Sequence, residues 1–193
     1  MLRVFICGAH SSGKTTLLQS LLVEPGHDFH VVNEIARKIL AKNRWQAEDF
    51  NPKINPATFY EFQLQILRAQ WHSDVELCRQ NTTYISDRGL DPIIYCKMYL
   101  GEEWFRKIMN TKEAEECIKR HKASNTLTVI IRPHRECIQE DGTRMVPKME
   151  ELVKFTEIFL EFFKEYDIQY EIIEELCLDT RVALLKSFID AKK

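Results

Sequence analysis

Gly8-Ala9-His10-Ser11-Ser12-Gly13-Lys14-Thr15 is the stretch that decides the fold of this chain. It has the spacing G-x-x-x-x-G-K-T, and it lies between an apolar run at residues 2–7 and a helical pattern at residues 16–22. The glycines allow a tight backbone curl that points several N–H groups at one anion. The start of the following helix adds the positive end of its dipole. The stretch therefore predicts a strand, a phosphate-binding loop and a helix that together hold a nucleoside triphosphate.

Two side chains of this loop have predicted roles of their own. Lys14 is expected to reach the β- and γ-phosphates, and the Thr15 hydroxyl is expected to hold Mg²⁺. ATP is the expected nucleotide. GTP stays open, because residues 176–181, where base contacts are expected, carry no decisive motif. The predicted nucleotide-binding residues are Gly8, Ala9, His10, Ser11, Ser12, Gly13, Lys14, Thr15 and Thr16.

Composition excludes several classes of protein. The 193 residues are 45% apolar and 29% charged, which is typical of one soluble globular domain. A net charge of −2 without a basic block argues against binding long nucleic acid. No apolar run approaches the roughly 18 residues of a membrane span, and the first residues enter a strand with no separate signal region. The six scattered cysteines are expected to be free thiols of a cytoplasmic protein.

Short apolar runs alternate with helical patterns along the chain. Strands are expected at residues 2–7, 31–32, 83–86, 127–131 and 170–173. This alternation predicts a parallel sheet covered by helices on both faces. Asn55-Pro56 and Asp91-Pro92 each predict a helix start, with a capping side chain before a proline. Residues 43–55 and 132–147 lack a regular pattern, and either close over the substrate and phosphates or form plain surface connections.

Acidic and basic residues follow two of the expected strands. Ligands of open α/β sheets bind at the carboxyl ends of the strands. Glu34, after the second strand, could take a proton from an attacking hydroxyl, or could merely complement the dipole of the next helix. Asp87, after the third, could hold Mg²⁺ beside Thr15, and Arg88 could clamp phosphate, or the two could form a structural ion pair. No Glu follows Asp87, and no N-K-x-D occurs, which disfavours motor ATPases and Ras-like GTPases.

The remaining candidate residues are weaker signals. Arg144 follows the turn signal Asp141-Gly142 and could stabilise charge on a transferring phosphoryl group, or could lie on a solvated loop. Phe62 belongs to a helical core stripe, but an aromatic ring and a glutamine amide could also contact a flat ring of a substrate. The candidate substrate residues are Arg37, Phe62, Gln63 and Arg68.

Together these pieces resemble the NadR-like AAA-type P-loop ATPases, a family related to nicotinamide riboside kinases and deoxynucleoside kinases. The resemblance rests on the loop at residues 8–15, on E-x-x-R at 34–37, on D-R-x-x-D-P at 87–92 and on D-G-x-R at 141–144. It implies an α/β P-loop NTPase with a five-stranded parallel sheet in the kinase order 2-3-1-4-5. It also implies Glu34 near the substrate hydroxyl, Asp87 near Mg²⁺ and Arg144 on a lid. Nucleoside kinases usually have Glu-Arg-Ser where this chain has Asp87-Arg88-Gly89.

We expect one domain over residues 1–193, with a lid at about residues 132–147, that acts as an ATP-dependent phosphotransferase. Its acceptor would be a small nucleoside-like hydroxyl, such as that of a nicotinamide riboside-like molecule. The alternative is a nucleotide switch with slow hydrolysis and a protein or membrane partner, and a polynucleotide-end kinase is disfavoured by the lack of positive charge. No protein partner is indicated. The expected catalytic residues are Lys14, Glu34, Asp87, Arg88 and Arg144, and the expected metal ligands are Thr15 and Asp87.

Overall fold

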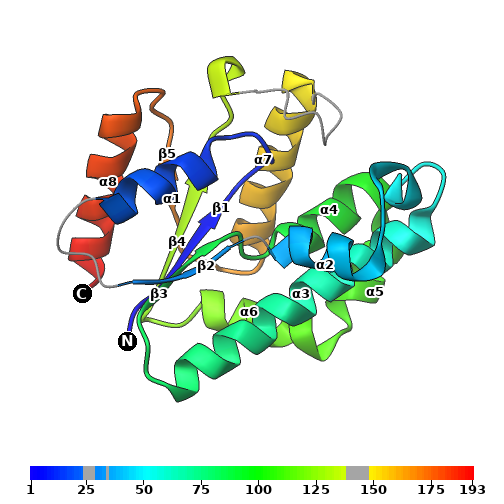
Figure 1. Ribbon diagram of the computed structural model, residues 1–193, viewed down its shortest axis with the longest axis horizontal. Coiled ribbons are helices and arrows are strands. Elements are labelled where there is room, and N and C mark those ends of the chain that lie inside the picture. The colour runs from blue at the N-terminus through cyan, green and yellow to red at the C-terminus, as the bar shows by residue number, and fades with distance from the viewer. Residues whose placement is uncertain (24–28, 34, 138–147) are drawn as a thin grey trace.

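A parallel sheet forms the centre of the molecule (Figure 1). The structure is a computed structural model and describes residues 1–23, 29–33, 35–137 and 148–193. The five strands are ordered β2-β3-β1-β4-β5, and every neighbouring pair is parallel, so the predicted fold class and strand order are confirmed. Each strand lies where the sequence predicted one. The strands are β1 Arg3–Cys7, β2 His30–Val32, β3 Tyr84–Asp87, β4 Thr126–Ile131 and β5 Glu171–Ile173.

Helices fill the connections between the strands. The α-helices are α1 Lys14–Val23, α2 Ile35–Asn43, α3 Pro56–Arg79, α4 Asp91–Leu100, α5 Glu102–Met109, α6 Lys112–His121, α7 Met149–Glu165 and α8 Leu178–Lys192. Helix α3 begins at Pro56 as predicted, although the Asn55 side chain makes no capping hydrogen bond. Helix α4 begins one residue earlier than predicted, so Asp91 is its first residue and not its cap. The reason is tertiary, because the Asp91 carboxylate accepts from the Gly89 amide and pairs with Arg88.

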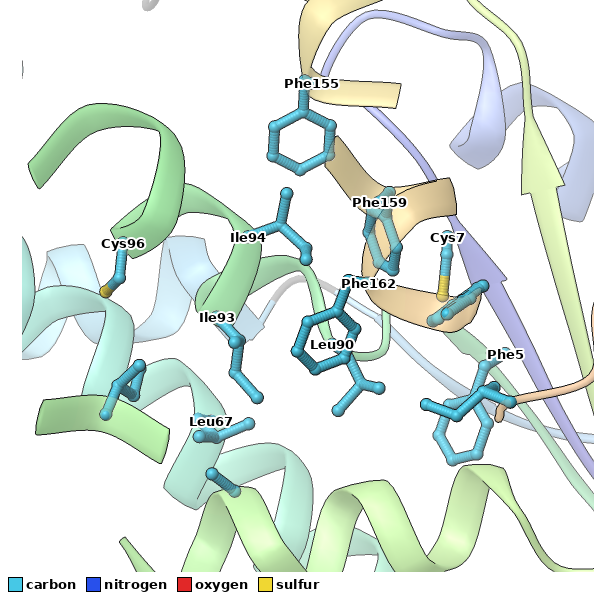
Figure 2. Packing of buried hydrophobic residues seen from close by; sticks show 14 of the residues in the cluster. Phe5, Cys7, Leu67, Leu90, Ile93, Ile94, Cys96, Phe155, Phe159 and Phe162 are labelled. Carbon is cyan, nitrogen blue, oxygen red and sulfur yellow. The ribbon is translucent and has the colours of Figure 1, made fainter. Parts of the chain in front are cut away.

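The two faces of the sheet carry separate cores, because successive strand side chains point to opposite faces. Val4 and Ile6 of β1 face α1 and α8 on one side. Phe5 and Cys7 face the other side, which is covered by α3, α4, α6 and α7. Figure 2 shows this second core, where three phenylalanines of α7 pack against residues of α4. Both faces of β1 are thus buried, as expected of the central strand of a parallel sheet.

Short 3₁₀ helices interrupt the two stretches that lacked a regular pattern. They are η1 Ala47–Phe50 and η2 Arg135–Cys137. Trp45 and Phe50 pack on Phe62 of α3, with ring centroids 6.2 and 4.8 Å away, so the first stretch is anchored to that helix. Most of the predicted lid, residues 138–147, lies outside the described residues.

All six cysteines are free thiols, as predicted. In the part of the chain that the structure describes, no helix has the length and apolar character needed to cross a membrane.

Candidate functional site

The carboxyl ends of β1 and β3 meet at one edge of the sheet. Ile6 pairs with Asp87, so the phosphate loop that follows β1 and the acidic residue that ends β3 emerge side by side. This is the edge at which open α/β sheets bind ligands. The strand order alone therefore brings together Gly8–Thr15 and Asp87–Arg88, which the sequence separates by more than seventy residues.

The backbone of the loop has the shape of an anion-binding concavity. Gly8, Ser11 and Gly13 all have positive φ values, of 132°, 58° and 84°. Such alternation turns consecutive N–H groups toward one point. Helix α1 begins immediately afterwards, at Lys14, and its first-turn residues Thr15 and Thr16 are exposed. The amides of the first turn of a helix have no partner within that helix, so they are available to an anion.

Lys14 is the cation of this loop. Its side chain is only 4% exposed, and Nζ donates to the carbonyls of Gly8 and Ala9 at 2.8 and 2.5 Å. Burial lowers the pKa of Lys14 to about 8, and the neighbouring Arg88 acts in the same direction, while Asp91 and Asp87 oppose it. Burial disfavours the charged form of any cation. A bound polyphosphate would supply the negative charge that this ammonium needs.

Thr15 and Asp87, the two predicted metal ligands, lie in direct contact. The Thr15 hydroxyl donates to Oδ2 of Asp87 at 2.7 Å. The other oxygen, Oδ1, is buried and has no hydrogen-bond partner among the described residues. A carboxylate oxygen and a hydroxyl are ligands that Mg²⁺ accepts, and the orphaned oxygen leaves donor capacity for it. The residues present therefore fit a magnesium ion beside the phosphate loop.

Arg88 occupies a strained corner next to this pair. Its φ of 115° is a backbone conformation that residues other than glycine rarely adopt. The guanidinium lies 3.5 Å from Asp91, whose side chain is fully buried, and within hydrogen-bonding reach of the Tyr95 hydroxyl. Burial would lower the pKa of Arg88, but Tyr95, Asp91 and Asp87 oppose it, and the net pKa is raised. The Tyr95 hydroxyl also lies 3.1 Å from Nδ1 of His10, which connects this corner to the phosphate loop.

Gly89 explains the departure from the Glu-Arg-Ser pattern. A Cβ atom at this position would lie 2.7 Å from Cε1 of His121 and 2.9 Å from Sγ of Cys7, so a serine side chain does not fit. The His121 ring stacks on Phe5 and its Nδ1 lies 2.8 Å from the Thr128 hydroxyl. Burial lowers the pKa of His121 to about 3, so the ring is neutral. The space that a serine would use is filled by this imidazole.

The predicted substrate residues occupy different surroundings. Phe62 is buried in a cluster with Ile39 and Ile66, and Gln63 is also buried. Arg68 forms an ion pair with Glu113 of α6 at 3.0 Å, and Arg37 is exposed on α2. The structure thus spreads these side chains over α2 and α3 and engages Arg68 with a neighbouring helix. Glu34 and Arg144 lie outside the described residues.

Three further residues of this region were missed by sequence reasoning as parts of a site. Asp91 was interpreted only as a helix cap, although its spacing of three from Arg88 fits an ion pair. Tyr95 lies one helical turn further on and carries no signal of its own. Arg181 of α8 ends the segment in which base contacts were expected, but its hydrogen bond from Nη1 to the carbonyl of Ser12, at 3.0 Å, was not predicted.

Several solved structures have a similar fold. A NadR protein in complex with NR matches with a TM-score of 0.75 and 18% identity over 99% of this chain, which spans only about half (51%) of that chain. Deoxyadenosine kinase from M. mycoides matches with a TM-score of 0.65 and 16% identity, covering 98% of this chain and 100% of its own. Shikimate kinase from Acinetobacter baumannii, in complex with shikimate, has a TM-score of 0.57 and 15% identity, covering 100% and 95%.

The comparison with family models gives a direct assignment. The model described as an AAA domain matches residues 3–181, which include the phosphate loop, the Asp87–Arg88 corner and Arg181. No curated protein matches the sequence. The chain therefore belongs to this AAA domain family and has the P-loop NTPase fold that nucleoside and shikimate kinases share.

Proposed function

We propose that this protein is an ATP-dependent phosphotransferase that acts on a hydroxyl group of a small nucleoside-like molecule. The observation that carries the proposal is the contact between Thr15 and Asp87, with an unpartnered Asp87 oxygen, beside the buried ammonium of Lys14. Positioning and charge stabilisation supply nearly all of the catalysis in phosphoryl transfer. This edge of the sheet holds the charges for that task, and the similar folds of a deoxyadenosine kinase and of a NadR protein in complex with NR support the substrate class.

In this scheme the nucleotide phosphates would lie along the loop amides, and Thr15 and Asp87 would hold Mg²⁺. When bound, the metal would neutralise charge on the phosphates. Lys14 and Arg88 stabilise the negative charge of the transferring group from two sides of the loop. Arg144, on the predicted lid, adds a third cation during transfer.

The acceptor needs a base to remove its proton, and Glu34 is our candidate. Strand β2 ends at Val32, which pairs with Ser86 of β3, so the chain that leaves β2 starts at the same sheet edge as Asp87. A carboxylate at that edge would accept the hydroxyl proton as the bond to phosphorus forms. Arg37, Phe62, Gln63 and Arg68 remain our candidates for contacts with the acceptor.

The test is a panel of acceptors with Mg-ATP. Purified protein is mixed with nucleosides, nicotinamide riboside, nucleoside monophosphates and shikimate, and ADP and the phosphorylated product are measured. We expect one nucleoside-like acceptor to raise ADP release at least about a hundredfold above the rate in buffer. Lys14→Ala and Glu34→Gln should abolish the increase, and exchange of ATP for GTP measures the base preference.

Three results would contradict the proposal in whole or in part. If no acceptor raises ADP release, while Mg-nucleotide still binds, the alternative of a slowly hydrolysing nucleotide switch is favoured. If Glu34→Gln retains full activity with the best acceptor, Glu34 is not the base. An active enzyme that prefers shikimate would keep the reaction type and overturn the acceptor class.

A further inference from the structure

Arg181 is a buried cation that the proposed reaction leaves without a role. It lies in the first turn of α8, and only 2% of its surface is exposed. Nη1 donates to the Ser12 carbonyl at 3.0 Å, and Nε donates to the Glu175 carbonyl. A Cβ atom on Gly13 would lie 2.9 Å from Nη1, so the guanidinium lies directly against the phosphate loop. Figure 1 shows α8 and α1 next to each other on the same face of the sheet.

Among the residues that the structure describes, no acid balances the charge of this guanidinium. No carboxylate of the described residues forms an ion pair with Arg181, and its Nη2 is buried without a hydrogen-bond partner. The nearest acids in sequence have other surroundings, because Glu174 pairs with Arg132, and Glu175 and Asp179 are exposed. A buried charge without a partner costs several kcal/mol in a typical protein. Carbonyl acceptors reduce this cost but supply no net negative charge.

The surroundings of Arg181 add further positive potential. The amino ends of both α1 and α8 lie beside it, since Gly13 precedes α1 and Arg181 itself is in the first turn of α8. The amino end of a helix carries a partial positive charge, so an arginine there is unfavourable. Lys14, the next residue of the loop, is a second buried cation. This arrangement of like charges is favourable only when an anion lies among them.

We propose that Arg181 is a second cation of the phosphate loop, which binds nucleoside polyphosphates more tightly through its charge and supports the Ser12–Gly13 backbone from behind. The inference rests on the nucleotide binding of the proposed function, and does not depend on the acceptor. Because the interaction is with charge, its contribution grows with the number of phosphates on the nucleotide. The ligand class is therefore a nucleoside di- or triphosphate rather than a monophosphate.

The test compares two substitutions by calorimetry on the full chain. Arg181→Met removes the charge and keeps a long side chain, and Arg181→Lys keeps the charge and loses the planar fork. We expect Arg181→Met to weaken Mg-ATP binding about thirtyfold or more, and AMP binding less than about threefold. Arg181→Lys should bind Mg-ATP within about fivefold of the wild type. Lys192→Met, an exposed cation near the far end of α8, is the matched control and should change nothing.

Each outcome decides the matter. Equal losses of Mg-ATP affinity in the Met and Lys variants would mean that shape and not charge is at work, and would overturn the proposal. Wild-type affinity in Arg181→Met would overturn it as well. If Arg181→Met does not fold, the melting temperature of Arg181→Lys is measured with and without Mg-ATP. Loss of the increase that Mg-ATP gives would overturn the proposal. Failure of the acceptor panel alone would leave this result standing, whereas a wild type that binds no Mg-nucleotide would end both proposals.

Discussion

Buried charged side chains lie at both ends of the strands: at the amino edge, where the strands begin, and at the carboxyl edge, where they end. The two groups make different contacts. At the amino edge, Asp74 of α3 accepts a hydrogen bond from the Tyr84 hydroxyl and pairs with both Arg3 and Arg120. Arg3 also donates to Asn125 at 2.8 Å. Here a single carboxylate is surrounded by donors, and the cations and the acid contact one another directly.

At the carboxyl edge, the described residues leave one buried cation without an acid. Lys14 contacts carbonyl and hydroxyl oxygens, and the neighbouring Arg88 pairs with Asp91 but has a strained backbone. Buried side-chain atoms without a hydrogen-bond partner occur in both groups, so they do not separate the two. Buried charge alone therefore does not identify a functional site. A buried cation that contacts no acid of the described residues, beside a strained backbone, is the better indicator.

Removing Asp74 should remove the ion pairs of the amino edge and cause the largest loss of stability. Asp74→Ala leaves Arg3 and Arg120 buried without their acid, and we expect a loss of about 3–5 kcal/mol in the free energy of unfolding. Denaturant unfolding measures it, with Glu76→Ala on the exposed side of the same helix as the control. Mg-nucleotide affinity of the folded protein should be unchanged. A stable Asp74→Ala variant with impaired nucleotide binding would reverse our distinction between the edges.

Removing Lys14 should have the opposite effect, because activity should fall and stability should not. Lys14→Met deletes a buried ammonium that contacts no acid in the described part of the chain, so the free energy of unfolding should be unchanged or higher. Phosphotransfer should fall by about 10²–10³, the loss seen when one charge-stabilising donor is removed from an active site. Steady-state kinetics and denaturant unfolding are measured on the same preparation. A variant that loses stability and keeps its activity would place Lys14 among the structural charges.

Filling the space at Gly89 should disturb the carboxyl edge by a smaller amount. Gly89→Ser places a side chain against His121 and Cys7, and we expect a loss of about 1–3 kcal/mol from overpacking. His121→Ala should rescue part of this loss, which a double-mutant cycle measures. Gly101→Ser is the control for backbone strain alone, since it has a φ of 83° and no atom within 4 Å of a Cβ there. Strict additivity of the Gly89 and His121 substitutions would contradict the steric explanation.

The smallest expected effect is a pH dependence that comes from Lys14. Its pKa is lowered from 10.5 to about 8, so between these values the unfolded chain holds the proton and the folded chain releases it. The contribution of Lys14 to stability therefore rises with pH through this window. Nucleotide affinity should change the other way and weaken several-fold as pH rises above about 8, because bound phosphates favour the ammonium.

Calorimetry of Mg-ATP binding at pH 8.5, in two buffers of different ionisation enthalpy, measures proton uptake. We expect a substantial fraction of a proton to be taken up by the wild type at this pH. The Lys14→Met variant, which has no such group, provides the baseline. Binding without any proton uptake would show that Lys14 is already fully charged in the free protein.

The fold was largely predictable from local signals. Each strand is a short apolar or β-branched run bounded by turn residues. The order in which the strands pair was implied by the family resemblance, which rests on the motifs at residues 8–15, 34–37, 87–92 and 141–144. The contact between Thr15 and Asp87 followed from that order, because both lie at carboxyl ends of neighbouring strands or just beyond. The sequence predicted well the features that depend on one segment or on one pair of parallel strands.

The rest depends on contacts between residues that are distant along the chain. Asp91 begins α4 and does not cap it, because Arg88 and the Gly89 amide hold its carboxylate. The space that a side chain at position 89 would need is filled by the ring of His121, the last residue of α6. Arg181 donates to the carbonyl of Ser12, which lies 169 positions earlier in the sequence. No periodicity or motif contains these contacts, since each depends on how helices pack on the sheet.

The central position of β1 in the sheet affects the order in which the nascent chain folds. Strand β1 is made first, yet it lies in the middle of the sheet, and Arg3 pairs with Tyr84 on one side and Thr126 on the other. During synthesis it has no neighbour until much of the chain has left the ribosome. The phosphate loop and Asp87 come together only when β1 pairs with β3, so nucleotide would stabilise the nascent protein only after β3 has emerged.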